Sequence, residues 1–209
     1  MNLVDLNLEQ FSKEVASSSP APGGGSVAAY AGAQGFALIA MVCRLTIGRE
    51  KFAAVQAEMK RLMEMAEAKQ ERLLSLVDED TYGFKAVMEA LSLAKNTEEE
   101  KSLRRKALEN ATLRAAEIPL QTAQLCLEGL VEIPVLIDGG NPNAISDMGV
   151  ASLVFSAGME GALYNVQINA LGLKNTEDRN SLLASCASMR DEGSRLIKEI
   201  QNLVLNKMK

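Results

Sequence analysis

Apolar residues recur at intervals of three and four along most of the chain, and this spacing predicts amphipathic helices. The longest such pattern runs from about residue 51 to 94. Its two apolar rows comprise Phe52, Met59, Ala66, Leu73 and Val87, and Val55, Leu62, Leu76 and Ala90. A helix of this length is stable only against equally long neighbours, in the same chain or in a second copy.

Two charged residues, Lys69 and Asp80, interrupt these rows. Asp80 is the more informative of the two, because aspartate is a poor helix former and its charge is costly to bury. Two interpretations stay open. Asp80 is either a paired or solvated structural charge, or a carboxylate that faces a cavity.

Two further stretches, at about 26–47 and 144–171, predict helices almost free of charge. Each begins at a loop rich in glycine, proline or asparagine, the first at 20–26 and the second at 138–147. We expect the two helices to pack together at the centre of the protein. If their loops meet, within a subunit or across two, they line one cleft.

Polar capping residues predict the starts of three more helices. Asn7 caps a short one, Thr97 opens a capping box, and Asn175 precedes the last. Pro119 and Pro134 are expected to kink or restart the helix that follows Thr97.

No segment of the sequence predicts a β-strand. The pattern therefore predicts an all-α protein, an antiparallel bundle of about five long helices that forms a single domain over residues 1–209. Its long apolar seams also favour a homodimer that pairs through these helices.

Charge and composition narrow the classes of function. A net charge of −5 argues against nucleic acid as the main partner. The chain has no histidine, so any chemistry must use carboxylates, Lys, Tyr, Ser, Thr, Asn or the backbone. Cys43, Cys126 and Cys186 match no metal or disulfide spacing, so we expect buried free thiols and a reducing, cytoplasmic location.

The uncharged run from 23 to 43 is long enough to cross a membrane. Gln34, the glycines within the run and its many alanines argue against a span, and the acidic segment before it does not fit a signal peptide. We therefore expect no membrane association.

The loop at 20–26 has a distinctive composition. Two prolines fix backbone angles, three glycines widen the choice of angles, and the exposed N–H groups of the following helix favour anionic or polar ligand atoms. A sharp turn into a buried helix is the alternative. Two alternatives also hold for Asn165 and Asn169, which share a helix face and either bond across helices or contact a ligand.

Four motifs occur in order along the chain, at Ser19–Ser26, Leu45–Gly48, Asp78–Asp80 and Gly140–Asp147. In combination they resemble the formiminotransferase-cyclodeaminase C-terminal family, and among its members most closely the stand-alone methenyltetrahydrofolate cyclohydrolases of bacteria. The resemblance covers nearly the whole chain. It implies an all-helical dimer that acts on the one-carbon unit between N5 and N10 of tetrahydrofolate, with no metal and no cofactor. The chain departs from the family pattern at Pro134, where the helix usually runs on.

The resemblance also implies roles for individual residues. Asp147 is the leading acid–base candidate, and Asp80 is a second catalytic carboxylate that polarises water or holds the pterin ring. The implied substrate contacts are Gly23, Gly24, Gly25, Ser26, Arg49, Lys51, Asn141, Asn143 and Asn169. Within this set, the loop offers backbone N–H groups, the asparagines bind pterin or carbonyl edges, and the two cations meet the glutamate carboxylates of folate.

Three functions follow as alternatives. The first is hydrolysis of 5,10-methenyltetrahydrofolate to 10-formyltetrahydrofolate. The second is cyclodeamination of 5-formiminotetrahydrofolate, which releases ammonia. The third, from another class, is a non-catalytic helical dimer that binds folate or serves as a scaffold. An assay that compares the two folate adducts separates them.

Overall fold

The computed structural model describes residues 2–209, and within this range every regular element is helical. The α-helices are α1 (Leu8–Val15), α2 (Gly24–Thr46), α3 (Gln56–Ser92), α4 (Glu98–Gly139), α5 (Ile145–Gly172) and α6 (Thr176–Lys207). Short 3₁₀ helices are η1 (Leu3–Asp5), η2 (Glu50–Val55) and η3 (Pro142–Ala144). The predicted all-α fold is confirmed.

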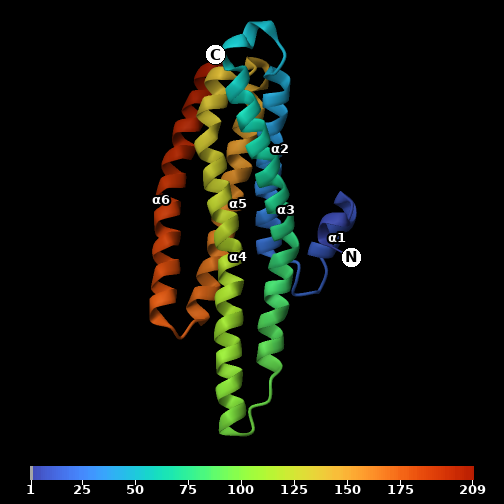
Figure 1. The fold of residues 1–209 in the computed structure, drawn as a ribbon, viewed down its shortest axis with the longest axis vertical. Coiled ribbons are helices and arrows are strands. Elements are labelled where there is room, and N and C mark those ends of the chain that lie inside the picture. The colour runs from blue at the N-terminus through green and yellow to red at the C-terminus, as the bar shows by residue number, and fades with distance from the viewer. Residues whose placement is uncertain (1) are drawn as a thin grey trace.

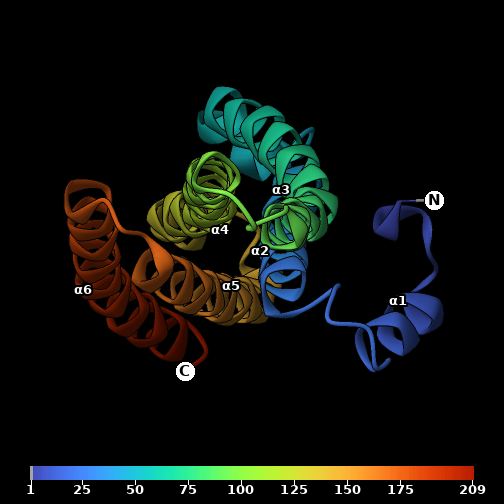
Figure 2. The same cartoon turned by 90° about the horizontal axis from the view of Figure 1, so that it is seen from below.

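Helices α2 to α6 run alternately up and down the long axis of the molecule (Figure 1). Helix α2 contacts α3, α4 and α5, and α5 contacts α4 and α6. The two helices predicted to be charge-poor, α2 and α5, thus pack together as expected, and Figure 2 shows them between α3 and α4 on one side and open space on the other. The antiparallel bundle of five long helices is confirmed. The α3–α4 hairpin extends past the lower end of the other helices (Figure 1).

The centre of the bundle is built on close approach between α2, α4 and α5. The fully buried ring of Phe155 on α5 fits against Gly35 of α2 and Gly129 of α4, where an added Cβ would come within 2.6 and 2.4 Å of ring atoms. The ring of Phe36 meets Phe155 edge-on, with 4.8 Å between centroids. Glycines here provide the space that the aromatic ring occupies.

Two helices, α2 and α4, are long and apolar enough to cross a membrane by length and composition alone. Within the bundle, 61% of the most apolar window of α2 is buried. Burial of this kind is typical of the core helix of a folded bundle.

Helix α4 continues through both of its prolines, so of the two expected effects, a kink or a restart, the restart is wrong at both Pro119 and Pro134. Proline has no N–H, and Pro119 therefore leaves the carbonyl of Ala115, four residues earlier, without its helical partner. The side chain of Asn169 on α5 donates to that carbonyl at 2.9 Å. A neighbouring helix thus satisfies the group that Pro119 leaves free.

The long helix predicted from about 51 begins later, at Gln56. The backbone at Phe52 is non-helical, with φ −113° and ψ 23°, and the 3₁₀ turn η2 replaces the expected first turns.

The three predicted caps are confirmed, since the side chains of Asn7, Thr97 and Asn175 each accept a hydrogen bond from a first-turn N–H. Of the seam-breaking charges, Lys69 pairs with Glu128 of α4 at 2.5 Å.

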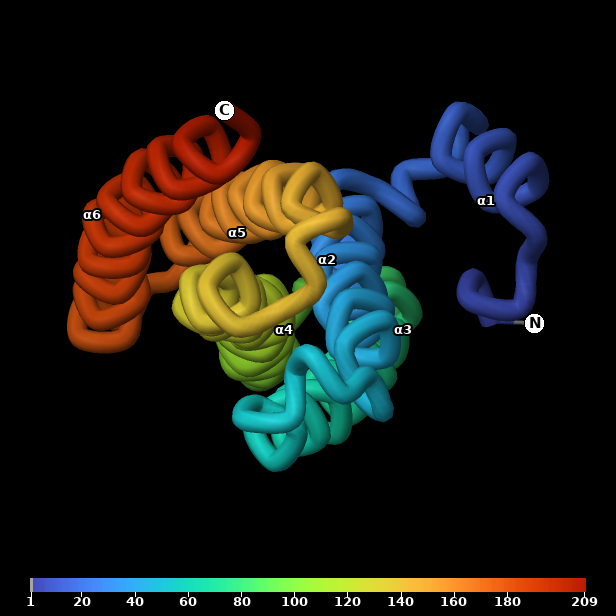
Figure 3. Tube along the Cα trace, turned by 90° about the horizontal axis from the view of Figure 1, so that it is seen from above, coloured from blue at the N-terminus to red at the C-terminus, as the bar shows by residue number. Residues whose placement is uncertain are grey.

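Helix α1 lies outside the bundle, at the side of α2 and α3 (Figures 2 and 3). Its Phe11 packs on Tyr30 of α2, with 5.4 Å between ring centroids. The backbone N–H of Leu3 donates to the Asp78 carboxylate at 2.6 Å, which ties η1 to α3. The segment before the Gly23 loop is therefore attached by a few contacts at the side of the bundle.

Candidate active site

A cavity of about 360 Å³ lies where α2 begins, in the space between α3, α4 and α5. This volume is in the range of small-molecule sites. We call it the Asp80 cavity. Its lining comprises Pro20, Ala21, Gly23, Gly24, Gly25, Asp80, Phe84, Val87, Ala115, Asn165, Ile168 and Asn169.

Asp80 of α3 reaches the first turn of α2. Its Oδ2 accepts a hydrogen bond from the hydroxyl of the fully buried Ser26 at 3.0 Å, and the backbone N–H of Ser26 also donates to the carboxylate. Since α2 has no side-chain cap of its own at Gly23, Asp80 caps the helix from another element. Both of the interpretations given for Asp80 hold, because this carboxylate is a structural partner and also faces a cavity.

Gly25 makes room for this carboxylate. A Cβ built on Gly25 would lie 2.1 Å from Asp80 Oδ1, which is far inside contact distance. Burial raises the pKa of the Asp80 carboxyl above its usual range, and the two bonds from Ser26 oppose that shift. A carboxyl with a raised pKa is a better proton acceptor near neutral pH than an ordinary one.

Two amide side chains complete the polar part of the cavity. Asn165 donates from Nδ2 to the Gly161 carbonyl at 2.8 Å, within α5, and Asn169 donates to the Ala115 carbonyl of α4. The cross-helix bonding weighed for these residues is therefore present at Asn169, and both residues also line the cavity. Phe84, Val87 and Ile168 supply apolar walls.

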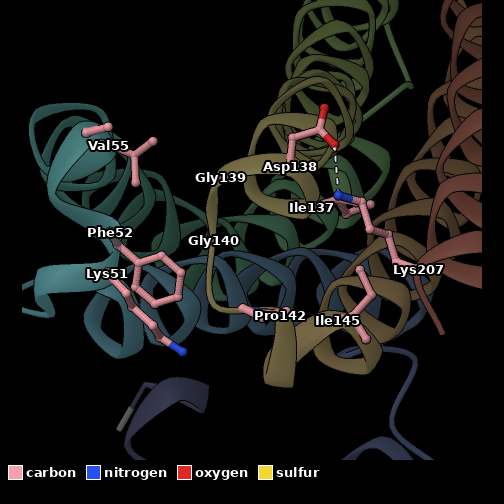
Figure 4. A pocket seen from close by; sticks show the side chains of 11 residues that line it. Lys51, Phe52, Val55, Ile137, Asp138, Gly139, Gly140, Pro142, Ile145 and Lys207 are labelled. Carbon is pink, nitrogen blue, oxygen red and sulfur yellow. Dashed lines mark ion pairs between the residues drawn. The ribbon is translucent and has the colours of Figure 1, made fainter.

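A second cavity, of about 350 Å³, lies at the opposite end of α2 and is called the upper cavity (Figure 4). Lys51 and Phe52 of η2 form one side, with the Lys51 ammonium 4.7 Å from the centre of the Phe52 ring. On the other side Lys207 of α6 pairs with Asp138 at 3.4 Å. Arg49 is exposed beside η2 and does not line this cavity.

The asparagine loop before α5 is fixed to the end of α2. The buried Asn141 donates from its backbone to Thr46 Oγ1 at 3.0 Å and from its side chain to the Leu45 carbonyl at 3.4 Å. Its Oδ1 accepts from the N–H of Asn143, whose own side chain is exposed. Asp147 is half-buried in the first turn of α5. Asn141 thus holds the loop in place.

One chain does not bring Asp80 and Asp147 together. Asp80 meets α2 at Gly25, whereas the loop that leads to Asp147 meets it at Thr46. At 1.5 Å per residue these two points of α2 are about 30 Å apart. The expectation of one cleft within a subunit is therefore wrong for this pair, and the alternative of a cleft across two copies is left.

Other candidate chemistry is limited in the described range. All three cysteines are buried and free, and burial raises the pKa of Cys126 to about 12 and of Cys43 to about 11. Such thiols are inert at neutral pH. Within residues 2–209 no group of three or more Cys, Asp or Glu side chains lies close enough to hold a metal ion.

Comparison with protein families gives a match to the model described as formiminotransferase-cyclodeaminase, over residues 7–188. The chain belongs to the formiminotransferase-cyclodeaminase family. A full-length relative is the methenyltetrahydrofolate cyclohydrolase of Methylorubrum extorquens, 38% identical over 96% of this chain and 97% of its own. The mouse formimidoyltransferase-cyclodeaminase is 40% identical over 80% of this chain, which spans 31% of that longer protein.

A solved member of the family has the same fold. The crystal structure of formiminotetrahydrofolate cyclodeaminase from Thermotoga maritima superposes with a TM-score of 0.87 over 98% of both chains, at 27% identity. The family resemblance predicted from four sequence motifs is confirmed.

Several residues that line the Asp80 cavity of this protein are not predicted by the sequence patterns. Phe84 follows Asp80 by one helical turn, so helix periodicity could have placed both on one face. The spacing of Asn165 and Asn169 predicts a shared helix face, but it does not assign Asn165 to the site. Nothing in the sequence indicated that Ala115 and Ile168 would meet there, because that depends on how α4 and α5 align along their lengths.

Proposed function

We propose that this protein hydrolyses 5,10-methenyltetrahydrofolate to 10-formyltetrahydrofolate, and that the reaction takes place in the Asp80 cavity. The observation that carries the proposal is the full-length match to a relative with this activity in its name, combined with a carboxylate held in a cavity at a helix start. The substrate is cationic at its one-carbon bridge, so a buried carboxylate stabilises it.

The chemistry needs only groups that the cavity contains. A water oxygen adds to the methenyl carbon, and Asp80 accepts the proton that the water loses. The bond from this carbon to N5 then breaks, N5 receives a proton, and the hydroxyl becomes the formyl oxygen as its own proton leaves. The sum is one water consumed and one proton released. General base assistance of this kind contributes about 10²- to 10⁴-fold in rate.

The glycine loop has a matching role. The N–H groups of Gly24 and Gly25 belong to the first turn of α2, where a helix provides no internal partner. They are suited to donate to the oxygen that enters at the one-carbon centre, since a helix start favours partial negative charge. Ser26, expected from its motif to bind substrate, instead orients Asp80, because its side chain is fully buried.

We further propose that two copies pair and that Asp147 reaches the cavity from the second copy. The outer face of α5 carries exposed apolar side chains along its length, namely Val150, Leu153, Tyr164, Ile168 and Leu171. A patch of this kind indicates a protein interface. Ile168 belongs to both this face and the Asp80 cavity.

A two-fold axis at the middle of α5 accounts for the separation of the two acids. Asp147 and Asn169 are equally far from residue 158, at opposite ends of α5. Antiparallel pairing of two α5 faces about that point places Asp147 of one copy beside Asn169 of the other. The same pairing carries Arg49 and Lys51 of the second copy toward the cavity, where they can meet glutamate carboxylates.

The assay for the main proposal compares two substrates. Purified protein should accelerate the loss of methenyltetrahydrofolate absorbance over buffer, and Asp80→Asn should reduce that rate at least about 100-fold while the helical circular dichroism is kept. Unchanged turnover in Asp80→Asn would remove Asp80 from the mechanism. Turnover of 5-formiminotetrahydrofolate alone, with ammonia release, would favour cyclodeamination, the second candidate, which is supported by the match to the Thermotoga protein.

Mixing two inactive variants tests the shared site. If each site takes Asp80 from one copy and Asp147 from the other, a heterodimer of Asp80→Asn and Asp147→Asn has one intact site and one doubly altered site. Unfolding and refolding the equimolar mixture should restore about a quarter of wild-type activity, because half of the dimers are mixed. A mixture as inactive as its components would contradict the shared site.

A protein that binds folate but turns over neither substrate would be the non-catalytic dimer.

A further inference from the structure

Asn165 and Asn169 stand four residues apart on α5 and both line the Asp80 cavity. Each amide nitrogen is engaged by a backbone carbonyl, that of Gly161 at 2.8 Å and that of Ala115 at 2.9 Å. Only the nitrogen of an amide can donate to a carbonyl, so these bonds fix which way each amide points. The Asn169 amide is held especially firmly, since its partner is the carbonyl freed by Pro119.

Both amide oxygens are left for a ligand. Among residues 2–209 neither oxygen accepts a hydrogen bond, and no buried side-chain nitrogen or oxygen in that range lacks a partner. The two oxygens are therefore open to solvent, and the cavity is the opening that both residues line. An amide oxygen carries the negative end of the side-chain dipole, so it favours a positively charged neighbour.

The charge of the residues that line the cavity also favours a positively charged ligand. Among the residues that the structure describes, Asp80 is the only ionisable side chain of the cavity, and no lysine or arginine lines it. Asp80 and Asn165 also lie against consecutive residues of α2, because a Cβ on Gly25 would meet Asp80 and a Cβ on Gly24 would lie 3.4 Å from Asn165 Nδ2. Asp80, Asn165 and Asn169 thus line the same small space.

We propose that Asn165 is a further substrate-binding residue, and that the oxygens of Asn165 and Asn169 contact the positively charged one-carbon group and make the Asp80 cavity selective for a cationic folate adduct over a neutral one. The proposal rests on the proposed function for the identity of the ligand. Both the methenyl and the formimino groups carry the positive charge, whereas a formyl group does not. The glutamate carboxylates of the folate must then lie outside this cavity.

The test compares two ligands that differ in charge at one atom. 5-Formimino- and 5-formyltetrahydrofolate have the same shape, with a protonated nitrogen in one and an oxygen in the other. We expect wild type to bind the formimino compound more tightly, and Asn165→Leu to lower that preference about tenfold, since a contact with a charged group is lost. The affinity for the formyl compound should change less than twofold. Loss of both affinities alike, or no change in their ratio, would overturn the proposal.

Asn165→Asp gives a second test, on the pH dependence of the rate, which would not change if residue 165 had only a structural role. A carboxylate beside Asp80 raises the pKa of the pair, so the acid limb of the pH–rate profile should shift to higher pH. An unshifted limb would show that residue 165 does not face Asp80. The matched control is Gln167→Leu, on α5 but outside the cavity, which should leave both readouts unchanged.

The binding ratio separates this proposal from the proposed function. It requires no turnover of the methenyl substrate, so a protein that fails to hydrolyse methenyltetrahydrofolate can still show the preference for charge. Conversely, an active hydrolase whose Asn165→Leu variant keeps the wild-type ratio would retain the proposed function and lose this inference.

Discussion

At the scale of single residues, two influences act in opposite directions on the pKa of Asp80. Removal from water favours the neutral acid, while the start of α2 and the two bonds from Ser26 favour the carboxylate. Burial is the larger effect, so the pKa of Asp80 is raised. This is the arrangement expected of a base that must release its proton again within each turnover.

The raised pKa gives a prediction for stability. Because the folded pKa of Asp80 lies above its unfolded value, the native state binds more protons between these two values, and Asp80 makes the protein less stable as pH rises through that window. Asp80→Asn removes this cost and keeps an acceptor for Ser26. Urea unfolding at a series of pH values should show the variant gaining stability over wild type from about pH 4 upward, where an ordinary Asp ionises. A pH-independent difference would contradict the prediction.

A second prediction concerns Gly25. In Gly25→Ala the added methyl must displace the Asp80 carboxylate, since it would lie 2.1 Å from Oδ1. A displacement of this size lowers activity by about 100-fold. Alanine is the better helix former, so the melting temperature should fall little. The control is Gly172→Ala, where the nearest atom to the added methyl is 3.4 Å away, and its activity should match wild type.

At the scale of elements, the apolar spacing and the caps were sufficient to predict which segments are helical. The start of α3 was misplaced because the non-helical backbone at Phe52 leaves no mark on the apolar rows. The continuity of α4 through Pro119 could not be predicted, since it involves Asn169, a residue 50 positions later on another helix. Solutions of this kind depend on packing between helices, which periodicity does not describe.

The packing of α2, α4 and α5 around Phe155 gives a prediction at this scale. Phe155→Ala removes a fully buried ring that fits against Gly35 and Gly129, and neither backbone can close the gap. We expect a loss of about 3–5 kcal/mol in the free energy of unfolding, measured by urea titration. The control is Leu205→Ala on α6, where 60% of the side chain is exposed and the change should be within about 0.5 kcal/mol. If Phe155→Ala lost as little free energy of unfolding as the control, the core would have to repack around the missing ring.

At the scale of the whole molecule, the fold class followed from the sequence but the relation of the two acids did not. The loops at 20–26 and 138–147, which precede the two charge-poor helices, are similar in composition, and this similarity suggested a common location. In the structure Asp80 meets the first loop, and Asp147 follows the second. The up-and-down course of the chain places one loop at each end of α2. Which ends of antiparallel helices coincide is set by loop lengths and register, and neither is visible in a hydrophobic pattern.

The exposed face of α5 gives a prediction at this scale. Leu153→Glu places a charge in the middle of the apolar stripe, where the wild-type side chain is 54% exposed. We expect light scattering to report a monomer in place of a dimer, with the helical signal kept, because a buried unpaired charge disfavours association. The control is Leu103→Glu on α4, which is 64% exposed and away from this face, and it should leave the mass unchanged. A monomeric wild type would end the shared-site proposal.

Asp80 both caps α2 and serves as the proposed base, and this combination affects how other members of the family are interpreted. A copy of the gene that had stopped doing chemistry would still be under selection to keep α2 properly terminated, and the bonds from Ser26 to Asp80 provide that termination. Asparagine would provide the same acceptor without the cost of a buried charge, so a polar residue at this position is weak evidence of activity, whereas retention of the acid itself points to an active enzyme. Cavity amides such as Asn165, whose bond to Gly161 stays within its own turn of helix, are free to change once turnover ceases, and they are a second marker of a working site.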